Sequence, residues 1–232
     1  MSIWKHLFSL EERRNWWTRK MPACPLRDFY EVPFPDRDLE WRQVDYLALD
    51  FETTGLQAGS DQLLSVGYAT VRGDSLLLRD ATHILIRPTI DIPEASAVVH
   101  GILDDRAAEA RSLEVILPQI LQALSGKVLL AHHAAIEYEF IDHACRNLYG
   151  YPFVCPVVDT LALEVRQFRL RDQAIRSGDL RLANARRRYG LPRYPAHNAL
   201  TDALSAAELF LAQTAYRSTR RALRLKDLVV VS

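Results

Sequence analysis

The amino-acid sequence predicts an α/β protein in which helices flank a mixed five-stranded sheet. Three strand-like segments come first, and the Gly73-Asp74 pair between the second and third is typical of a hairpin turn. Helical patterns then alternate with two short apolar segments, an order that is typical of parallel strands joined by crossovers. We therefore expect three antiparallel strands, followed by strands added in parallel.

Each element has its own sequence signal. Strands are expected at residues 46–52, 63–71, 76–86, 128–131 and 154–158. Helices are expected at residues 10–20, 113–124, 134–149, 160–171, 180–189 and 199–214. The helix at 113–124 has the clearest pattern, because its apolar residues recur on one helix face and Ser112 precedes it as an N-cap.

The first 42 residues are predicted to form an N-terminal arm, and residues 43–232 the main domain. All four tryptophans lie in this arm. After the helix at 10–20, prolines at 22, 25, 33 and 35 predict an extended chain. We expect the arm to pack on the main domain, or else to bind a second copy of the chain or another protein.

Composition excludes several classes of protein. Hydrophobic residues make up 49% of the 232 residues and charged residues 25%, which is ordinary for a globular protein. The longest apolar run is about ten residues, too short to cross a membrane. The three cysteines are read as reduced thiols of a cytoplasmic protein. A zinc site made of Cys145, Cys155 and His143 is a weaker alternative, because the spacing matches no common zinc pattern.

The charges are balanced overall but unevenly distributed. Lysine and arginine number 29, as do aspartate and glutamate, yet residues 166–193 contain nine arginines and only two acidic residues. Guanidinium groups bind phosphate through two hydrogen bonds. We expect this stretch, and above all Arg186, Arg187 and Arg188, to bind the backbone of a nucleic acid, with a solvated helix face as the alternative.

One pair of neighbouring acidic residues would be unfavourable without a cation. Asp50 and Glu52 lie on the same face of a predicted strand, where side chains alternate. Two neighbouring carboxylates repel each other unless a cation joins them, although acids are also common where a strand simply ends in solvent. Thr53 and Thr54 follow in a turn whose N–H groups could face a phosphate.

Two further segments carry candidate site residues. Glu137 lies where a short strand leads into a helix, at the sheet edge where α/β proteins bind ligands, although an acid there also favours the helix dipole. Asp202 lies in the early turns of the last long helix, and Pro192 and Pro195 place His197 on the preceding loop. A loop histidine beside a carboxylate is a candidate general base, with an ordinary surface histidine as the alternative.

Together these segments resemble the DEDDh branch of the DEDD exonucleases, which have a ribonuclease H-like fold. The first motif is similar to residues 50–55, the second to 132–137 and the third to 197–202. A segment containing Glu94 and His100 also resembles the family, and the resemblance covers residues 44–215. Two positions depart from the pattern, since Glu137 replaces the usual aspartate and His133 the usual asparagine. Asp142 is the alternative acid, but it is out of phase on the helix.

The resemblance implies a 3′–5′ exonuclease that hydrolyses single-stranded DNA to nucleoside 5′-monophosphates. It implies two divalent cations, Mg²⁺ or Mn²⁺, and His197 as the base that accepts a proton from the attacking water. The cations would be held by Asp50, Glu52, Glu137 and Asp202. The terminal nucleotide would lie near Thr53, Thr54, Glu94 and His100. A related enzyme that trims RNA, or a catalytically inactive nucleic-acid-binding subunit, are the alternatives.

Overall fold

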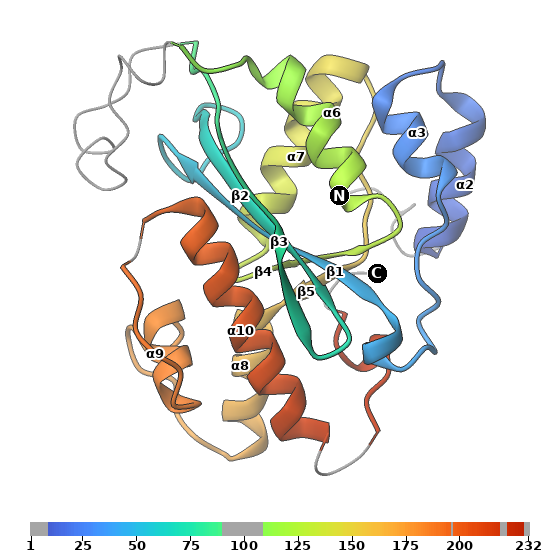
Figure 1. The fold of residues 1–232 in the computed structure, drawn as a ribbon. Coiled ribbons are helices and arrows are strands. Elements are labelled where there is room, and N and C mark those ends of the chain that lie inside the picture. The colour runs from blue at the N-terminus through green and yellow to red at the C-terminus, as the bar shows by residue number, and fades with distance from the viewer. Residues whose placement is uncertain (1–8, 90–108, 196, 219–221, 230–232) are drawn as a thin grey trace.

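A five-stranded mixed sheet forms the centre of the computed structural model, which describes residues 9–89, 109–195, 197–218 and 222–229 (Figure 1). The strand order is β3-β2-β1-β4-β5. The strands are β1 (Asp45–Thr53), β2 (Leu63–Arg72), β3 (Ser75–Leu85), β4 (Val128–Ala131) and β5 (Val157–Asp159). The first three are antiparallel, whereas β4 and β5 add in parallel to β1. The predicted α/β fold with a mixed five-stranded sheet is confirmed.

Alternation along β1 divides the apolar core between the two faces of the sheet. Leu47, Leu49 and Phe51 belong to the cluster that α6 (Leu113–Leu124) and α7 (Ala135–Tyr149) cover. Tyr46 and Ala48 belong to the opposite cluster, which α8 (Thr160–Leu170) and α10 (Ala199–Ser218) cover. In Figure 1, α6 and α7 lie above the central strands and α8 and α10 below them. Asp50 therefore belongs to the α10 face of the sheet by the same alternation.

The N-terminal segment folds as two helices, α2 (Leu10–Lys20) and α3 (Pro25–Glu31). The prediction of an extended chain after residue 22 was wrong for α3, because Pro25 occupies the first turn, where its missing N–H costs no hydrogen bond. Leu26 and Phe29 are buried in the same cluster as α6 and α7. The described part of the arm thus packs on the sheet-bearing part of the chain, while the boundary at residue 42 stays a prediction.

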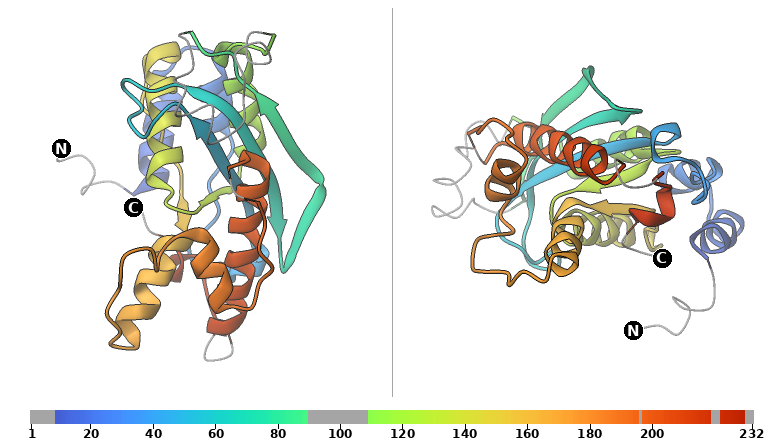
Figure 2. Two further views of the ribbon diagram at one scale, coloured as in Figure 1. Left: turned by 90° about the vertical axis from the view of Figure 1, so that its left-hand side faces the viewer. Right: turned by 90° about the horizontal axis from the view of Figure 1, so that it is seen from below.

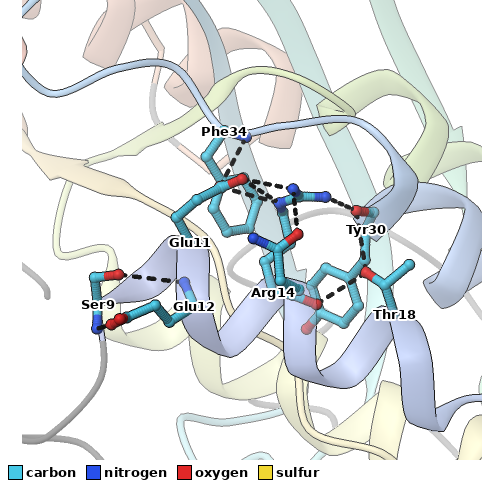
Figure 3. A network of polar contacts seen from close by, with 8 residues as sticks. Ser9, Glu11, Glu12, Arg14, Thr18, Tyr30 and Phe34 are labelled. Atoms are coloured by element: carbon cyan, nitrogen blue, oxygen red, sulfur yellow. Dashed lines mark hydrogen bonds and ion pairs between the residues drawn. The ribbon is translucent and has the colours of Figure 1, made fainter.

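A buried arginine joins α2 to the end of α3 (Figure 3). The Arg14 guanidinium donates hydrogen bonds to Glu11 on its own helix and to the backbone oxygen of Tyr30. Thr18 also donates to the Tyr30 oxygen, at 3.3 Å. These bonds satisfy a carbonyl at the end of α3 that has no partner within its own helix.

The remaining boundaries differ little from those predicted. The strand β5 begins three residues later than expected, and α9 (Leu182–Arg188) is shorter than the predicted helix at both ends. The N-terminal helices and α9 lie at opposite ends of the molecule in two perpendicular views (Figure 1, Figure 2). None of the described helices combines the length and the apolar character that a membrane crossing requires.

Candidate active site

Three carboxylates from two distant parts of the chain meet at the end of β1. Asp50 and Glu52 come from this strand, and Asp202 comes from the first turn of α10. Each offers one oxygen atom such that all three atoms lie within 4.8 Å of one another. Among the described residues, this is the only group of three or more His, Cys, Asp or Glu side chains close enough to share a metal ion.

A glycine on the neighbouring strand allows α10 to come this close. Gly67 pairs with Asp50 in the β1–β2 register. A Cβ atom at Gly67 would lie only 2.0 Å from the backbone nitrogen of Leu200 and 2.2 Å from the carbonyl carbon of Ala199. The first turn of α10 therefore rests directly on the backbone of β2, which places Asp202 beside Asp50.

Glu137 contributes a fourth carboxylate from the first turn of α7. The residue is 3% exposed, and its Oε2 atom has no hydrogen-bond partner in the described part of the chain. Burial and, to a smaller extent, the nearby charge of Asp159 raise the pKa of Glu137 to about 8. Asp142 does not replace it, because its two oxygens accept hydrogen bonds from the Phe153 N–H and from Arg146.

Burial and mutual repulsion favour the neutral forms of the other acids. The pKa of Asp50 is raised well above its usual value by burial and then by Glu137, Asp202 and Glu52. Burial and Asp202 raise the pKa of Glu52 to about 7, and burial also raises the pKa of Asp202. The three acids that meet, Asp50, Glu52 and Asp202, fit a hard divalent cation such as Mg²⁺ or Mn²⁺. Glu137 is not close enough to belong to this group of three, although it lines the same cleft and its charge acts on Asp50.

His197 lies on the loop before α10, as predicted. Its side chain is exposed, and its backbone N–H donates to Asp202 Oδ2 at 2.9 Å. Its φ angle of 68° is in the left-handed region, so the loop turns sharply here. Asn198 then caps the helix by accepting the N–H of Thr201 at 3.1 Å. The same few residues thus place both His197 and Asp202.

A cleft of about 1030 Å³ lies at these residues, and all of the acids predicted to hold the cations except Asp202 belong to its lining. Its walls include Asp50, Glu52, Glu137 and His197, together with Thr53 and Thr54 of the predicted nucleotide site. The Thr53 hydroxyl donates to the Gly55 oxygen at 2.6 Å, and Thr54 N–H donates to the Gln62 oxygen at 2.9 Å. Glu94 and His100 lie outside the described residues.

Two polar residues at the cleft were not assigned roles by sequence reasoning. Asp159 ends β5, and its Oδ1 accepts the backbone N–H groups of His133 and Leu161, each at 2.9 Å. His132 is held between Thr160 Oγ1 and the Leu180 oxygen, each at 2.8 Å. Asp159 could have been found from the sequence, since it ends a short apolar strand at the same sheet edge as Glu137.

The structure corrects the prediction for two of the three consecutive arginines. Arg186 is buried, and its guanidinium donates to the Ser205 oxygen at 2.7 Å and to Glu208 at 2.7 Å. Arg188 donates to the buried carboxylate of Glu164 at 2.7 Å. Arg186 therefore serves the fold, because its charge is paired in the interior, whereas Arg188 is exposed with its charge already paired by Glu164. Arg187 is exposed, and its role stays a prediction.

The zinc alternative has no support among the described residues. Cys145 and Cys155 are buried free thiols, and burial raises the pKa of each. His143 instead forms a hydrogen bond with Asn147 at 2.8 Å. These side chains do not form a group that could bind a metal.

Comparison with known proteins identifies the family. The model of the RNase T exonuclease family matches residues 47–210, a range that contains all four acids and His197. The chain belongs to this exonuclease family. The matched range agrees with the range of the sequence resemblance, residues 44–215, so the three motifs lie within one exonuclease domain.

Curated relatives of this exonuclease include subunits of bacterial DNA polymerases. It is 31% identical over 174 residues to the PolC-type DNA polymerase III of Thermotoga maritima, covering 75% of this chain and 12% of that protein. It is 30% identical over 175 residues to the DNA polymerase III subunit epsilon of Treponema pallidum, covering 75% of this chain and 79% of that protein. The exonuclease thus spans only a small part of its PolC-type relatives.

Solved structures confirm the fold of the exonuclease. The nuclease domain of 3′hExo, described as a DEDDh family member bound to rAMP, superposes with a TM-score of 0.64 at 14% identity, covering 80% of this chain and 98% of that one. Exonuclease I of E. coli, in complex with a dA16 oligonucleotide, superposes with a TM-score of 0.67 at 16% identity. The match covers 76% of this chain and 42% of that one. The predicted DEDDh resemblance and ribonuclease H-like fold are confirmed.

Proposed function

We propose that this exonuclease hydrolyses the 3′-terminal phosphodiester bond of single-stranded DNA and releases nucleoside 5′-monophosphates. The observation that carries the proposal is the convergence of Asp50, Glu52 and Asp202 near Glu137, whose buried Oε2 atom has no hydrogen-bond partner among the described residues. Carboxylates buried this closely are unfavourable in an ion-free protein, and divalent cations would remove the repulsion. The site therefore fits chemistry on a phosphate ester assisted by cations.

Each side chain has a separate part in the proposed mechanism. Asp50, Glu52 and Asp202 would hold the divalent cations, and Glu137 would support them. Bound cations would supply positive charge to the attacking and leaving oxygens of the phosphate. His197 would accept the proton of the attacking water, since its imidazole lies exposed at the cleft and its backbone is fixed to Asp202. Thr53 and Thr54 would contact the terminal nucleotide.

Single-stranded DNA is the favoured substrate because of the relatives. The polymerase subunits act in DNA synthesis by name, and the Exonuclease I structure holds a DNA oligonucleotide. The complex of 3′hExo with rAMP supports the second candidate, an exonuclease that trims RNA. Discrimination between the two needs a contact to the 2′-OH, so the substrate test must compare matched DNA and RNA oligomers.

The decisive experiment is a degradation assay with DNA and RNA oligomers of one sequence, labelled at either end. We expect Mn²⁺-dependent shortening from the 3′ end of single-stranded DNA and a mononucleotide product that comigrates with a nucleoside 5′-monophosphate. Asp50→Asn should reduce the rate by about a hundredfold or more, because it removes a cation ligand.

The matched control for this assay is Glu139→Gln, an exposed carboxylate on α7 outside the cleft, which should keep the wild-type rate. Equal rates in wild type and Asp50→Asn would reject the proposed chemistry. Faster degradation of RNA than of DNA would instead assign the enzyme to RNA trimming.

A further inference from the structure

The arginine-rich stretch at residues 166–193 divides into two sets in the structure. Four of its nine arginines donate hydrogen bonds to other described residues. Arg186 and Arg188 pair with acids, while Arg166 donates to the Asp227 oxygen at 2.6 Å and Arg171 to the Tyr216 hydroxyl at 2.9 Å. The charges of Arg186 and Arg188 are therefore already paired with acids, and Arg166 and Arg171 are each held by one hydrogen bond, so the remaining five arginines are the ones least engaged by the fold.

Two of those five line the cleft that contains the acids. Arg176 and Arg181 lie on the loop between α8 and α9, and both are exposed walls of the cleft. Within the described ranges, neither guanidinium has a hydrogen bond or an ion pair to another residue. Their five N–H donors each are thus free to meet an anion in the cleft.

The loop that carries these arginines is held in place by hydrogen bonds. The Asp179 carboxylate accepts the backbone N–H of Arg176 at 2.8 Å, and the Asn184 side chain donates to the Gly178 oxygen at 2.9 Å. A carbonyl oxygen can only accept, so His132 Nε2 donates to the Leu180 oxygen at 2.8 Å. Because His132 directly follows β4, this bond fixes the loop relative to the acidic group.

The negative charge of the acids in the cleft explains why arginines would be needed to bind a phosphate there. Four carboxylates line or lie beside the floor of the cleft, and they repel the phosphates of an approaching strand. A guanidinium group pairs with a phosphate through two charge-assisted hydrogen bonds. Two unpaired arginines on a fixed loop therefore provide the positive charge that the rest of the cleft lacks.

We propose that Arg176 and Arg181 bind the backbone phosphates of the single-stranded substrate and hold the strand in the cleft. The inference rests on the proposed nuclease function and assigns to two residues a role that the sequence assigned to the whole stretch. The contacts are to phosphate, so they are independent of sequence and sensitive to salt.

Binding is tested by fluorescence anisotropy with 5′-fluorescein-labelled oligo(dT), in EDTA, over a series of salt concentrations. Arg176→Ala and Arg181→Ala should each weaken binding roughly fivefold, the loss expected for one ion pair. Each should also reduce the slope of log affinity against log salt by about 0.7, the value for one phosphate contact on a single strand. Arg181→Lys should keep the slope, because it keeps the charge.

Steady-state kinetics in Mn²⁺ separate strand binding from chemistry. Both alanine variants should raise KM by a similar factor and leave kcat within about twofold, because a contact to a backbone phosphate that is equally strong in the bound substrate and in the transition state affects binding alone. The matched control is Arg37→Ala, an exposed arginine outside the cleft and outside the arginine-rich stretch, which should bind as wild type.

Several outcomes would overturn the inference. Wild-type affinity and salt slope in both alanine variants would do so, as would an equal loss in Arg187→Ala, which would return binding to the stretch as a whole. Wild-type protein that binds no oligonucleotide would do so as well. The anisotropy measurement needs no hydrolysis, so failure of the proposed nuclease function would appear separately, as binding without degradation.

Discussion

At Glu137, burial favours the neutral carboxyl group, whereas the proposed chemistry needs the charged carboxylate. The residue is 3% exposed, its Oε2 atom has no hydrogen-bond partner among the residues described, and burial raises its pKa to about 8. A buried carboxylate without a partner destabilises the fold whenever it is charged. Under the proposed function, that negative charge would have a use as a support of the bound cations.

Glu137→Gln should therefore make the protein inactive and more stable. Glutamine has the same shape but no charge, so we expect a loss of about a hundredfold in the rate of DNA degradation. At alkaline pH without cations, Tm should rise by about 2–4 °C. Rate and thermal unfolding of the purified variant check both changes, and Glu139→Gln on the same helix should change neither. Lower stability in Glu137→Gln would contradict a costly buried charge.

The raised pKa values also predict how stability depends on pH. The pKa of Glu52 is raised to about 7 and that of Glu137 to about 8, both from 4.5, because burial disfavours the charged forms. Both acids are neutral in either state below the unfolded pKa, so their full contribution to stability is present there. It is lost as the pH rises through the folded pKa values. Ion-free protein should thus lose free energy of unfolding between about pH 5 and pH 8.

Thermal unfolding in EDTA and in Mn²⁺ across this pH range checks the prediction. Cations favour the charged carboxylates, so Mn²⁺ should raise Tm more at about pH 8 than at pH 5. The Asp50→Asn variant should show a smaller difference between EDTA and Mn²⁺. Parallel pH profiles with and without Mn²⁺ would argue against cation binding by these acids.

Among the elements, the contact of α10 with β2 controls the geometry of the site. A Cβ atom on Gly67 would lie 2.0 Å from the backbone of Leu200, so Gly67→Ala must push the first turn of α10 away from the sheet. We expect a loss of about 2–3 kcal/mol in the free energy of unfolding and a lower kcat, because Asp202 moves with the helix. Denaturant unfolding and kinetics measure the two effects.

A second glycine provides the control for this substitution. Gly59 is exposed, and a Cβ atom there would meet nothing within 4 Å. Gly59→Ala should leave both stability and kcat close to wild type. Equal behaviour of the two variants would mean that the approach of α10 to β2 is not what positions Asp202.

Most elements could be predicted from sequence because their signals are local. A short apolar run marks β1, and the apolar stripe and the N-cap position of Ser112 mark α6, so the expected bounds agree closely with those of the structure. The helix α3 was missed because the prolines at 22, 25, 33 and 35 favour an extended chain. The helix is stabilised by burial of Leu26 and Phe29 against residues distant in the sequence.

The candidate site was predictable in its acids but not in its arginines. Asp50, Glu52 and Asp202 belong to short motifs whose order and spacing are informative, and the structure brings these three together. A run of arginines contains no information about which side chains face the cleft, since this depends on how α9 packs. Arg186 therefore lies buried against Glu208, whereas Arg181, five residues earlier, lines the cleft.

On the scale of the whole molecule, Tyr30 ties the N-terminal helices to the sheet-bearing part of the chain. Its hydroxyl donates to the Pro152 oxygen at 2.9 Å and accepts the Val154 N–H at 2.7 Å. Trp16 on α2 is 46% exposed, which leaves an aromatic surface that another protein could contact. The predicted contact of this arm with a second copy or a partner stays a prediction.

Tyr30→Phe should weaken this attachment without affecting catalysis. It leaves a buried N–H and a buried carbonyl unpaired, which should lower the free energy of unfolding by about 1–3 kcal/mol. Thermal unfolding and degradation kinetics check this, with kcat expected to stay at the wild-type value because Tyr30 lies outside the cleft. Tyr151→Phe is the control, since no hydrogen bond joins its hydroxyl to another described residue. An equal change in Tm for both variants would contradict a specific role for Tyr30.

The contacts of α3 also bear on the order in which the chain can fold during synthesis. Tyr30 bonds to the Val154 N–H, 124 residues further along, and Phe29 packs on Phe153. On a ribosome these partners emerge long after α3 itself. The apolar side chains of α3 that pack on these partners stay exposed to solvent until then. This nascent segment is therefore a natural substrate for chaperones that shield newly made chains.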